Sequence, residues 1–390
     1  MSITVAEVAF WGCLLMVAHT YLIYPALLFV VYGLIQIRRD SWYLMGGRDR
    51  RRPSLRPEAL PRISLVVAAH DEEACLPAKL ANLVELDYPH DKLEVIFVSD
   101  GSSDGTNAIL ARAEGPGVRV VVLPERGGKS SALNHGVEAA RHEILVFSDA
   151  STLLEPDTLR RLVRHFADKR VGVVCGALCL QGNAEFRQTE GVYWSYEKAL
   201  RVMEARLGAT VTASGALYAL RRDAWQPLEP DVMIDDFVVP MNARRVGYRV
   251  VLDPEATAVE CAAESVAQEF VRRVRLAVGS FRALGQLLRV RMDAFTALAF
   301  FSHKLLRWVL PFLMVGLLVT SGLLCARPFY RLALLAQLAL YAWALAGHLF
   351  KERMAPLRYG LLGYFLMAVN LAFLVGFVHF LSGRAEVKWK

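Results

Sequence analysis

Polar side chains follow a short apolar run at the point where that run ends. Residues 143–148 (EILVFS) predict a buried strand, and Asp149 and Ser151 come directly after it. In open α/β sheets, ligands bind just outside the carboxyl ends of the strands. A carboxylate there can hold a hard divalent cation, which in turn can hold a diphosphate. The same pattern also fits a strand followed by an aspartate that caps the next helix.

Three further polar clusters occur where predicted strands end or predicted helices begin: residues 70–73 (HDEE), 100–105 (DGSSDG) and 127–129 (GGK). Successive βα loops lie at one edge of a parallel sheet, so we expect these clusters to converge near Asp149. The two glycines before Lys129 let the backbone approach a diphosphate at a helix N-terminus. The G-x-x-x-x-G-K-[ST] spacing of a P-loop is absent.

Alternating strands and helices must position these clusters. The predicted strands are 63–69, 93–99, 118–123, 143–148 and 171–180. The predicted helices are 72–85, 129–141, 155–167 and 188–206. Strands separated by helices of this length indicate a mostly parallel sheet built from right-handed βαβ units.

The chain of 390 residues is 55% hydrophobic, which is high for a soluble protein, and carries a net charge of +7. Residues 7–36 have no charge after Glu7 and are long enough to span a bilayer. Basic residues follow at once, so the positive-inside rule predicts a signal anchor with the following residues in the cytoplasm. The basic excess lies beside apolar segments, which favours membrane surface and phosphate ligands over nucleic acid.

The predicted order of segments is a transmembrane helix, a basic linker, a cytoplasmic catalytic domain, an amphipathic interfacial helix and three C-terminal spans. Their bounds are 7–36, 37–60, 61–284, 285–304 and 305–381. This topology leaves the basic residues after 381 outside, against the charge rule, so the orientation of the tail stays open.

An ordered set of motifs resembles the membrane-embedded family-2 glycosyltransferases with the A-type fold, such as bacterial poly-N-acetylglucosamine, hyaluronan and cellulose synthases. The motifs are VVAAHDEE, VSDGSSDGT, RGGKSSALNHG, FSDAST, TASGALYALRR, MIDDFVVP, EFVRRVRLA and FFSHKLLRWVLP. The resemblance covers roughly residues 60–312 and implies an α/β, Rossmann-like mixed sheet domain inserted between transmembrane helices.

The resemblance also assigns the donor side of the site. The backbone near Ala68 and the carboxylates of Glu72 and Asp100 would hold the uridine of a UDP-sugar. Lys129 would contact the nucleobase or a phosphate. Asp149 would be the first residue of the family's metal-binding D-x-D motif, but the third residue of the motif is Ser151 here. Magnesium or manganese still fits, because such ions keep waters and take one or two carboxylates plus substrate phosphates.

Asp235 and Asp236 occupy the place of the family's Glu-Asp pair, and by position Asp236 would be the general base. Inverting transfer needs a carboxylate that deprotonates the acceptor hydroxyl as it attacks the anomeric carbon. The two aspartates could also cap the helix predicted at 236–246, and the two roles are compatible.

Arg272, Arg273 and Arg275 match the family's Q-(Q/R)-x-R-W element, with Arg275 at its fixed arginine. Arg272, Arg275 and Arg282 fall on one helical face, so they could form a cationic lid over the leaving diphosphate. Leu276 replaces the tryptophan that stacks beneath the acceptor in processive enzymes. The rings of Tyr193 and Trp194 could instead lie beneath an acceptor sugar, or they could simply pack in the core.

The expected function is an inverting, metal-dependent transfer of a sugar from UDP to a glycan or lipid-linked acceptor at the inner face of the cell membrane. The expected setting is exopolysaccharide or cell-envelope glycan synthesis, with membrane lipids but no nucleic acid as partners. One alternative is a polyprenyl-phosphate or lipid glycosyltransferase that adds a single sugar. The other is a non-catalytic nucleotide-binding scaffold, which the serine at position 151 would suit.

Overall fold

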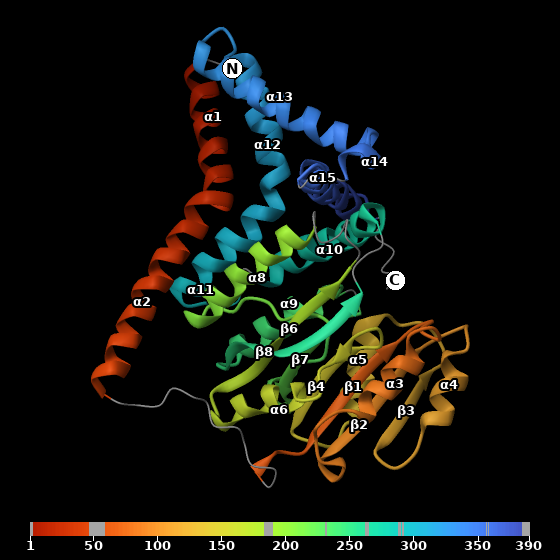
Figure 1. The fold of residues 1–390 in the computed structure, drawn as a ribbon. Coiled ribbons are helices and arrows are strands. Elements are labelled where there is room, and N and C mark those ends of the chain that lie inside the picture. The colour runs from red at the N-terminus through yellow and green to blue at the C-terminus, as the bar shows by residue number, and fades with distance from the viewer. Residues whose placement is uncertain are drawn as a thin grey trace.

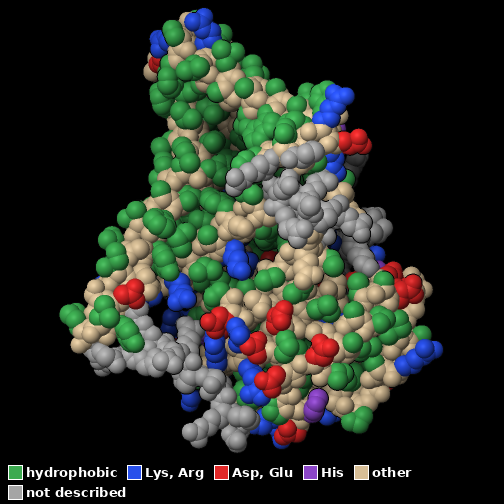
Figure 2. All heavy atoms as spheres, viewed as in Figure 1, with side chains coloured by type: hydrophobic (Ala, Val, Ile, Leu, Met, Phe, Trp, Pro, Cys, Tyr) green, Lys and Arg blue, Asp and Glu red, His purple; other side chains and the backbone are tan. Residues whose placement is uncertain are grey.

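The computed structural model describes residues 3–46, 59–182, 190–230, 232–261, 265–287, 290, 292–355, 357 and 359–383. Half of the predicted basic linker and all of the basic tail lie outside these residues. A sheet domain forms one half of the molecule and long helices rise from it (Figure 1). Hydrophobic side chains cover the helices, whereas acidic and basic side chains gather over the sheet domain (Figure 2).

The sheet has eight strands in the order β3-β2-β1-β4-β7-β6-β8-β5. Its parallel part contains β1 (Ile63–Ala69), β2 (Leu93–Asp100), β3 (Val118–Leu123) and β4 (Ile144–Asp149). These strands confirm the parallel sheet predicted from the apolar runs. Every residue of β1 is buried, as expected for a central parallel strand covered on both faces.

The remaining strands make the sheet mixed. They are β5 (Leu153–Leu154), β6 (Val171–Gln181), β7 (Leu217–Arg221) and β8 (Arg249–Cys261). Strand β7 lies antiparallel to both β4 and β6, and β5 pairs antiparallel with the end of β8. The β5–β8 register sets Leu153 opposite Val259 and so brings the end of β8 beside the loop that follows Asp149.

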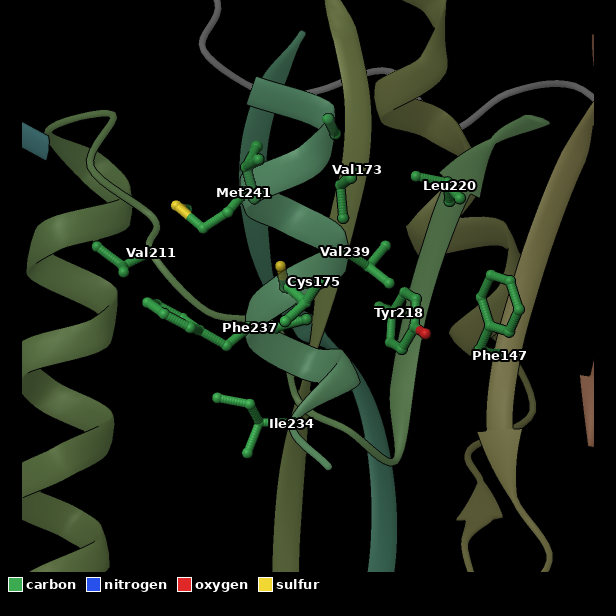
Figure 3. Packing of buried hydrophobic residues seen from close by; sticks show 14 of the residues in the cluster. Phe147, Val173, Cys175, Val211, Tyr218, Leu220, Ile234, Phe237, Val239 and Met241 are labelled. Carbon is green, nitrogen blue, oxygen red and sulfur yellow. The ribbon is translucent and has the colours of Figure 1, made fainter. Parts of the chain in front are cut away.

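Helices cover both faces of the sheet. They are α3 (Leu76–Val84), α4 (Thr106–Ala113), α5 (Lys129–Ala139), α6 (Thr158–Val163), α8 (Glu190–Arg206) and α9 (Asp235–Arg245), with short 3-10 turns η3 (His90–Lys92), η4 (Arg164–Ala167) and η5 (Arg222–Ala224). Alternate residues of β1 enter two different core clusters, one on each face. In Figure 3, Val239 of α9 points toward Tyr218 and Cys175 of the sheet.

The described part of the chain has four helices that are long and apolar enough to cross a membrane: Thr4–Met45, Ala294–Leu323, Pro328–Leu349 and Leu362–Leu381. The first comprises α1 (Ile3–Ala18), η1 (His19–Ile23) and α2 (Tyr24–Gly46). The others comprise α11 (Ala294–Ala299), η6 (Phe300–Leu305) and α12 (Leu306–Leu323), then α13 (Pro328–Leu349), then α15 (Leu362–Leu381), with the short α14 (Lys351–Met354) between the last two.

The predicted interfacial helix 285–304 is divided between two elements. Its first residues end α10 (Val266–Leu287), and its last belong to α11 and η6. Asp293 starts the new helix, because its carboxylate accepts hydrogen bonds from the amide and hydroxyl of Thr296 at 3.0 and 2.6 Å. Helix α10 is instead the element that lies against the membrane-spanning part, along α15.

Gly376 lets α15 approach α10 closely. A Cβ atom at this position would lie 2.5 Å from the Cβ of Ala277 and 2.9 Å from the carbonyl oxygen of Val274. We expect Gly376→Ala to lower the free energy of unfolding by about 1–3 kcal/mol, since α10 would have to move. Gly322→Ala is the matched control in α12, where a Cβ has open space. Thermal unfolding in detergent compares the two, and equal melting temperatures would contradict this account of the helix contact.

Candidate active site

A cleft of about 1300 Å³ lies at the carboxyl ends of the parallel strands, beside α8 and α10. Nine of the residues predicted to form the site line it: Glu72, Lys129, Asp149, Ser151, Trp194, Asp235, Asp236, Arg272 and Arg275. They come from segments spread over two hundred residues of sequence, and the sheet edge brings them together as the motif positions predict.

Lys129 is the cation at the centre of the acidic residues. Its ammonium lies 2.9 Å from Asp149 Oδ1 and 3.5 Å from Asp235 Oδ1, and it donates a hydrogen bond to the carbonyl of Gly215 at 3.1 Å. Burial disfavours the charged amine, but Asp149 and Asp235 outweigh burial and raise the pKa of Lys129 above its ordinary value. Lys129 therefore stays charged and holds the two carboxylates near one another.

Asp235 and Asp236 form the first turn of α9. Asp235 is buried and accepts a hydrogen bond from the hydroxyl of Tyr218 at 3.3 Å. The helix is capped at Ile234, and no side chain caps it there. Burial raises the pKa of the Asp236 carboxyl, while Lys304 and Lys129 oppose that rise. Both aspartates line the cleft. Lys129 and Tyr218 engage the Asp235 carboxylate, so Asp236 is the better placed of the two to meet an acceptor.

The Asp100 carboxylate binds the backbone of a neighbouring loop, whereas the resemblance implies that it binds uridine. Its side chain is fully buried, and its two oxygens accept hydrogen bonds from the amides of Gly127 and Gly128 at 2.8 and 2.7 Å. Gly128 needs this support because its φ of 87° lies in the left-handed region. In this structure Asp100 shapes the loop that leads to Lys129, and its side chain does not line the cleft.

Ala68 also lies away from the cleft. It is a buried residue inside β1, paired with Val98 on one side and Asp149 on the other. Ala68 does not line the cleft, so the contact of the backbone near it with uridine stays a prediction. Glu72 fits the nucleotide-binding prediction better, because it lies beyond the end of β1 and lines the cleft.

The candidate metal residues offer few ligands. Among the described residues, no group of three or more His, Cys, Asp or Glu side chains is arranged to hold a metal ion. Asp149 and Ser151 line the cleft together with Glu260, a carboxylate that sequence reasoning missed. Glu260 is close enough to Asp149 that burial and this neighbour raise the pKa of Glu260. Two carboxylates and a hydroxyl suit a hard cation that keeps its waters and takes substrate phosphate oxygens.

The three arginines predicted to bind the nucleotide sugar divide into two groups, and Arg282, the third member of the predicted lid, does not line the cleft. Arg272 and Arg275 line the cleft. Arg273 does not, because its guanidinium binds Glu269 at 2.5 Å and lies 5.4 Å from the ring centroid of Tyr193. Arg273 and Tyr193 thus fix α10 against α8, and the prediction that Arg273 binds the nucleotide sugar is corrected.

Arg275 is positioned to receive an anion. Burial and the neighbouring Arg272 lower its pKa, which shows that positive charge is crowded and poorly solvated at this wall of the cleft. We expect Arg275→Ala to reduce donor turnover on the order of 10²-fold, because the charge developing on a leaving diphosphate loses a donor. Arg282→Ala, on the same helix but outside the cleft lining, is the control. Steady-state nucleotide release measures both, and equal losses would contradict a specific role for Arg275.

Trp194 and Tyr193 lie at the boundary between the cleft and a second, smaller cavity. Trp194 lines both spaces, whereas Tyr193 lines only the second. Tyr193 also makes an edge contact with Phe365 of α15, with ring centroids 5.6 Å apart. Trp194 is therefore the aromatic residue that can meet an acceptor in the cleft, and Tyr193 has mainly a packing role.

Comparison with known proteins finds related sequences and a related fold. The profile described as "Glycosyl transferase family 2" matches residues 64–226. Poly-beta-1,6-N-acetyl-D-glucosamine synthase of Staphylococcus aureus is 26% identical over 247 residues, which are 60% of this chain and 58% of that protein. The Staphylococcus epidermidis enzyme of the same name is 25% identical over 57% of this chain and 55% of its own length. This chain thus matches somewhat over half the length of these curated relatives.

A solved mannosyltransferase from Pyrobaculum calidifontis, in complex with GDP-mannose and Mn²⁺, has a similar fold. The TM-score is 0.67 at 23% identity, covering 95% of this chain and 100% of that one. The similarity extends well beyond the sheet domain and therefore includes the apolar helices. Residues 64–226 of this chain are a glycosyl transferase family 2 domain with the A-type glycosyltransferase fold, joined to four helices of membrane-spanning length.

Proposed function

We propose that the chain is an inverting, metal-dependent glycosyltransferase that moves a sugar from UDP to a glycan or lipid-linked acceptor. The observation that carries the proposal is the meeting of Asp149, Asp236 and Arg275 in one cleft. A diphosphate site, a base and a cationic lid are the groups that this reaction needs. The relatives act in poly-N-acetylglucosamine synthesis according to their names, which supports a role in exopolysaccharide or cell-envelope glycan synthesis.

In the proposed reaction, the acceptor hydroxyl oxygen forms a bond to the anomeric carbon from the side opposite the diphosphate. Asp236 takes the hydroxyl proton, and the bond from the anomeric carbon to the diphosphate breaks with its electron pair. Arg272 and Arg275 stabilise the charge on the departing diphosphate. A bound Mg²⁺ or Mn²⁺ would supply Lewis-acid stabilisation of the same phosphates, held by Asp149 with Ser151 and Glu260 nearby.

The proposed location is the inner membrane with the sheet domain in the cytoplasm. Four apolar helices support a multi-pass protein. Arg38 and Arg39 lie near the end of α2, on the side from which the chain continues to the sheet domain. Basic residues at that end support a cytoplasmic position for it by the positive-inside rule.

A donor screen tests the proposal. The purified full chain is incubated with UDP-N-acetylglucosamine, UDP-glucose or GDP-mannose, each with Mg²⁺, Mn²⁺ or a chelator, and nucleotide release is measured. We expect release from a UDP-sugar only when metal is present. Failure to release nucleotide from any donor, with membrane extract as the acceptor source, would contradict the enzymatic proposal.

Transfer of a single sugar to a lipid is the second candidate. Leu276 lies at the cleft where processive members of the family carry a tryptophan, and this favours one transfer per acceptor. Counting sugars per labelled product separates the two candidates, since a ladder of product lengths would exclude the single transfer.

A further inference from the structure

Lys79 of α3 lies in the interior of the sheet domain, and the proposed reaction makes no use of it. Its exposed fraction is 0%. Lysine side chains are almost never fully buried unless they are paired. Within the described residues, the contacts of the Lys79 nitrogen are two hydrogen bonds and not an ion pair. Because burying such a group is costly without partners, these two bonds show what the lysine holds.

The two hydrogen bonds of Lys79 enclose the loop of residues 148–152, on which the candidate metal residues lie. Lys79 Nζ donates to Ser148 Oγ at 2.8 Å and to the carbonyl oxygen of Thr152 at 2.5 Å. Ser148 comes directly before Asp149, and Thr152 comes directly after Ser151. The side chain thus joins the two ends of this loop from the side of α3.

The hydrogen bonds within the loop itself are longer. The Thr152 amide donates to the carbonyl oxygen of Asp149 at 3.2 Å, and the Ser148 hydroxyl donates to the same oxygen at 3.3 Å. Both distances lie at or beyond the upper end of the usual range for their type. Thr152 Oγ1 is buried and, among the described residues, has no hydrogen-bond partner. The shorter bonds from Lys79 are therefore the ones that fix the course of the loop.

Helix α3 is held in place independently of these two bonds. Leu76 is fully buried in one of the two core clusters that cover the sheet. Asn82, one turn after Lys79, donates to the carbonyl oxygen of Leu154 at 2.8 Å and accepts from the amide of Leu154 at 2.8 Å. A change at Lys79 should therefore leave α3 on the sheet and alter the loop.

The bonds from Lys79 do not depend on its charge. Burial lowers the pKa of Lys79 to about 7, and the charge of Asp149 opposes that fall. The neutral amine keeps two N–H groups, which can donate to both oxygens as the ammonium does. It also exerts no charge repulsion on a cation bound at Asp149.

Asp149 needs such support more than the first aspartate of a complete D-x-D motif would, because Ser151 replaces the second one. Its Oδ1 contacts Lys129 at 2.9 Å in the cleft. The rest of its orientation is set by the loop that carries it. Groups that orient a metal ligand from behind commonly contribute a factor of roughly 10–100 to metal affinity.

From these contacts we propose that Lys79 is a positioning residue for the metal site: it holds the loop of residues 148–152 so that Asp149 can bind the cation of a metal–nucleotide complex. Lys79 does not line the cleft, so it would touch neither the nucleotide sugar nor the metal. The inference rests on the proposed function, because it gives Lys79 a task in the donor site described there.

Mn²⁺ binding to the purified full chain in the presence of UDP, followed by electron paramagnetic resonance, tests the proposal. Lys79→Met keeps an unbranched side chain but removes the N–H donors, and we expect the affinity for Mn²⁺ to fall on the order of tenfold. Asn134→Ala is the control, because it removes two hydrogen bonds between α5 and the backbone of Leu228, each 2.9 Å long, outside the cleft lining. It should lower the melting temperature without changing the Mn²⁺ affinity. Unchanged affinity in Lys79→Met, or an equal loss in both variants, would overturn the proposal.

Ser148→Ala tests the same contact from the other side and keeps the lysine, so it serves if Lys79→Met does not fold. It removes one of the two acceptors and should weaken Mn²⁺ binding less than Lys79→Met does. The double variant should bind Mn²⁺ as Lys79→Met does, because the bond between the two side chains is already lost. Full additivity of the two losses, or no loss in Ser148→Ala, would contradict a joint action through this bond.

UDP affinity without metal and sugar transfer, measured in parallel, separate this proposal from the proposed function. In Lys79→Met, UDP affinity without metal should equal that of the unaltered chain, and saturating Mn²⁺ should restore most of the turnover. A general loss of structure would lower both and would overturn the positioning role. If Mn²⁺ binding depends on Lys79 but no donor yields transfer, the proposed function is contradicted and the positioning role stands. If transfer is metal-dependent but indifferent to Lys79, the reverse holds.

Discussion

Asp236→Asn is expected to reduce sugar transfer by about 10²–10⁴-fold while UDP affinity stays close to that of the unaltered chain. The amide has nearly the same shape as the carboxylate but cannot take a proton from the acceptor. Asp236 lines both the cleft and the adjoining cavity, so it stands where donor and acceptor would meet. Lys129 contacts Asp149 and Asp235 and should keep its position. Single-turnover transfer and UDP titration are the two measurements.

Asp157→Asn is the matched control for this substitution, because Asp157 also begins a helix, α6, but contacts only Arg161 on the surface. It should leave transfer unchanged. A parallel loss of UDP affinity in Asp236→Asn would show that this carboxylate supports the donor site or a metal rather than the proton transfer.

Asp149→Ala is expected to weaken metal-dependent donor binding on the order of 10²-fold or more, and with it turnover. The D-x-D motif has a serine in place of its second aspartate, so the Ser151 hydroxyl and the Glu260 carboxylate are the groups that would have to replace Asp149. The substitution also frees the Lys129 ammonium from its 2.9 Å contact. Without Asp149, that ammonium stays beside Asp235, and the cation should no longer bind tightly.

Titration of Mn²⁺ by electron paramagnetic resonance, in the presence of UDP, measures this effect directly. Ser151→Ala should weaken Mn²⁺ binding far less than Asp149→Ala does, because a neutral hydroxyl is the weaker ligand. The Mn²⁺ affinity of Glu260→Gln should lie between those of Ser151→Ala and Asp149→Ala. If Ser151→Ala were as damaging as Asp149→Ala, the assignment of the main ligand would be wrong.

Local sequence patterns predict the parallel half of the sheet and the edge where the site forms. Buried strands such as residues 63–69 and 144–149 are visible as short apolar runs, and polar clusters mark their carboxyl ends. Parallel strands joined by helices have their βα loops on the same edge, so convergence of Lys129 with Asp149 follows from local patterns. Four apolar helices were visible for the same reason, since length and composition are local properties.

Which side chains face the cleft depends on contacts between elements that are far apart in the sequence. Asp100 and Arg273 carry the residue types that the motifs lead one to expect, yet the first is bound by two amides and the second by Glu269. The pairing of β5 with β8 brings Glu260 to the site. The packing of η6 against α8 brings Lys304 there. Such contacts join elements far apart in sequence, and their geometry depends on how strands cross and helices pack, which no periodicity of a single segment encodes.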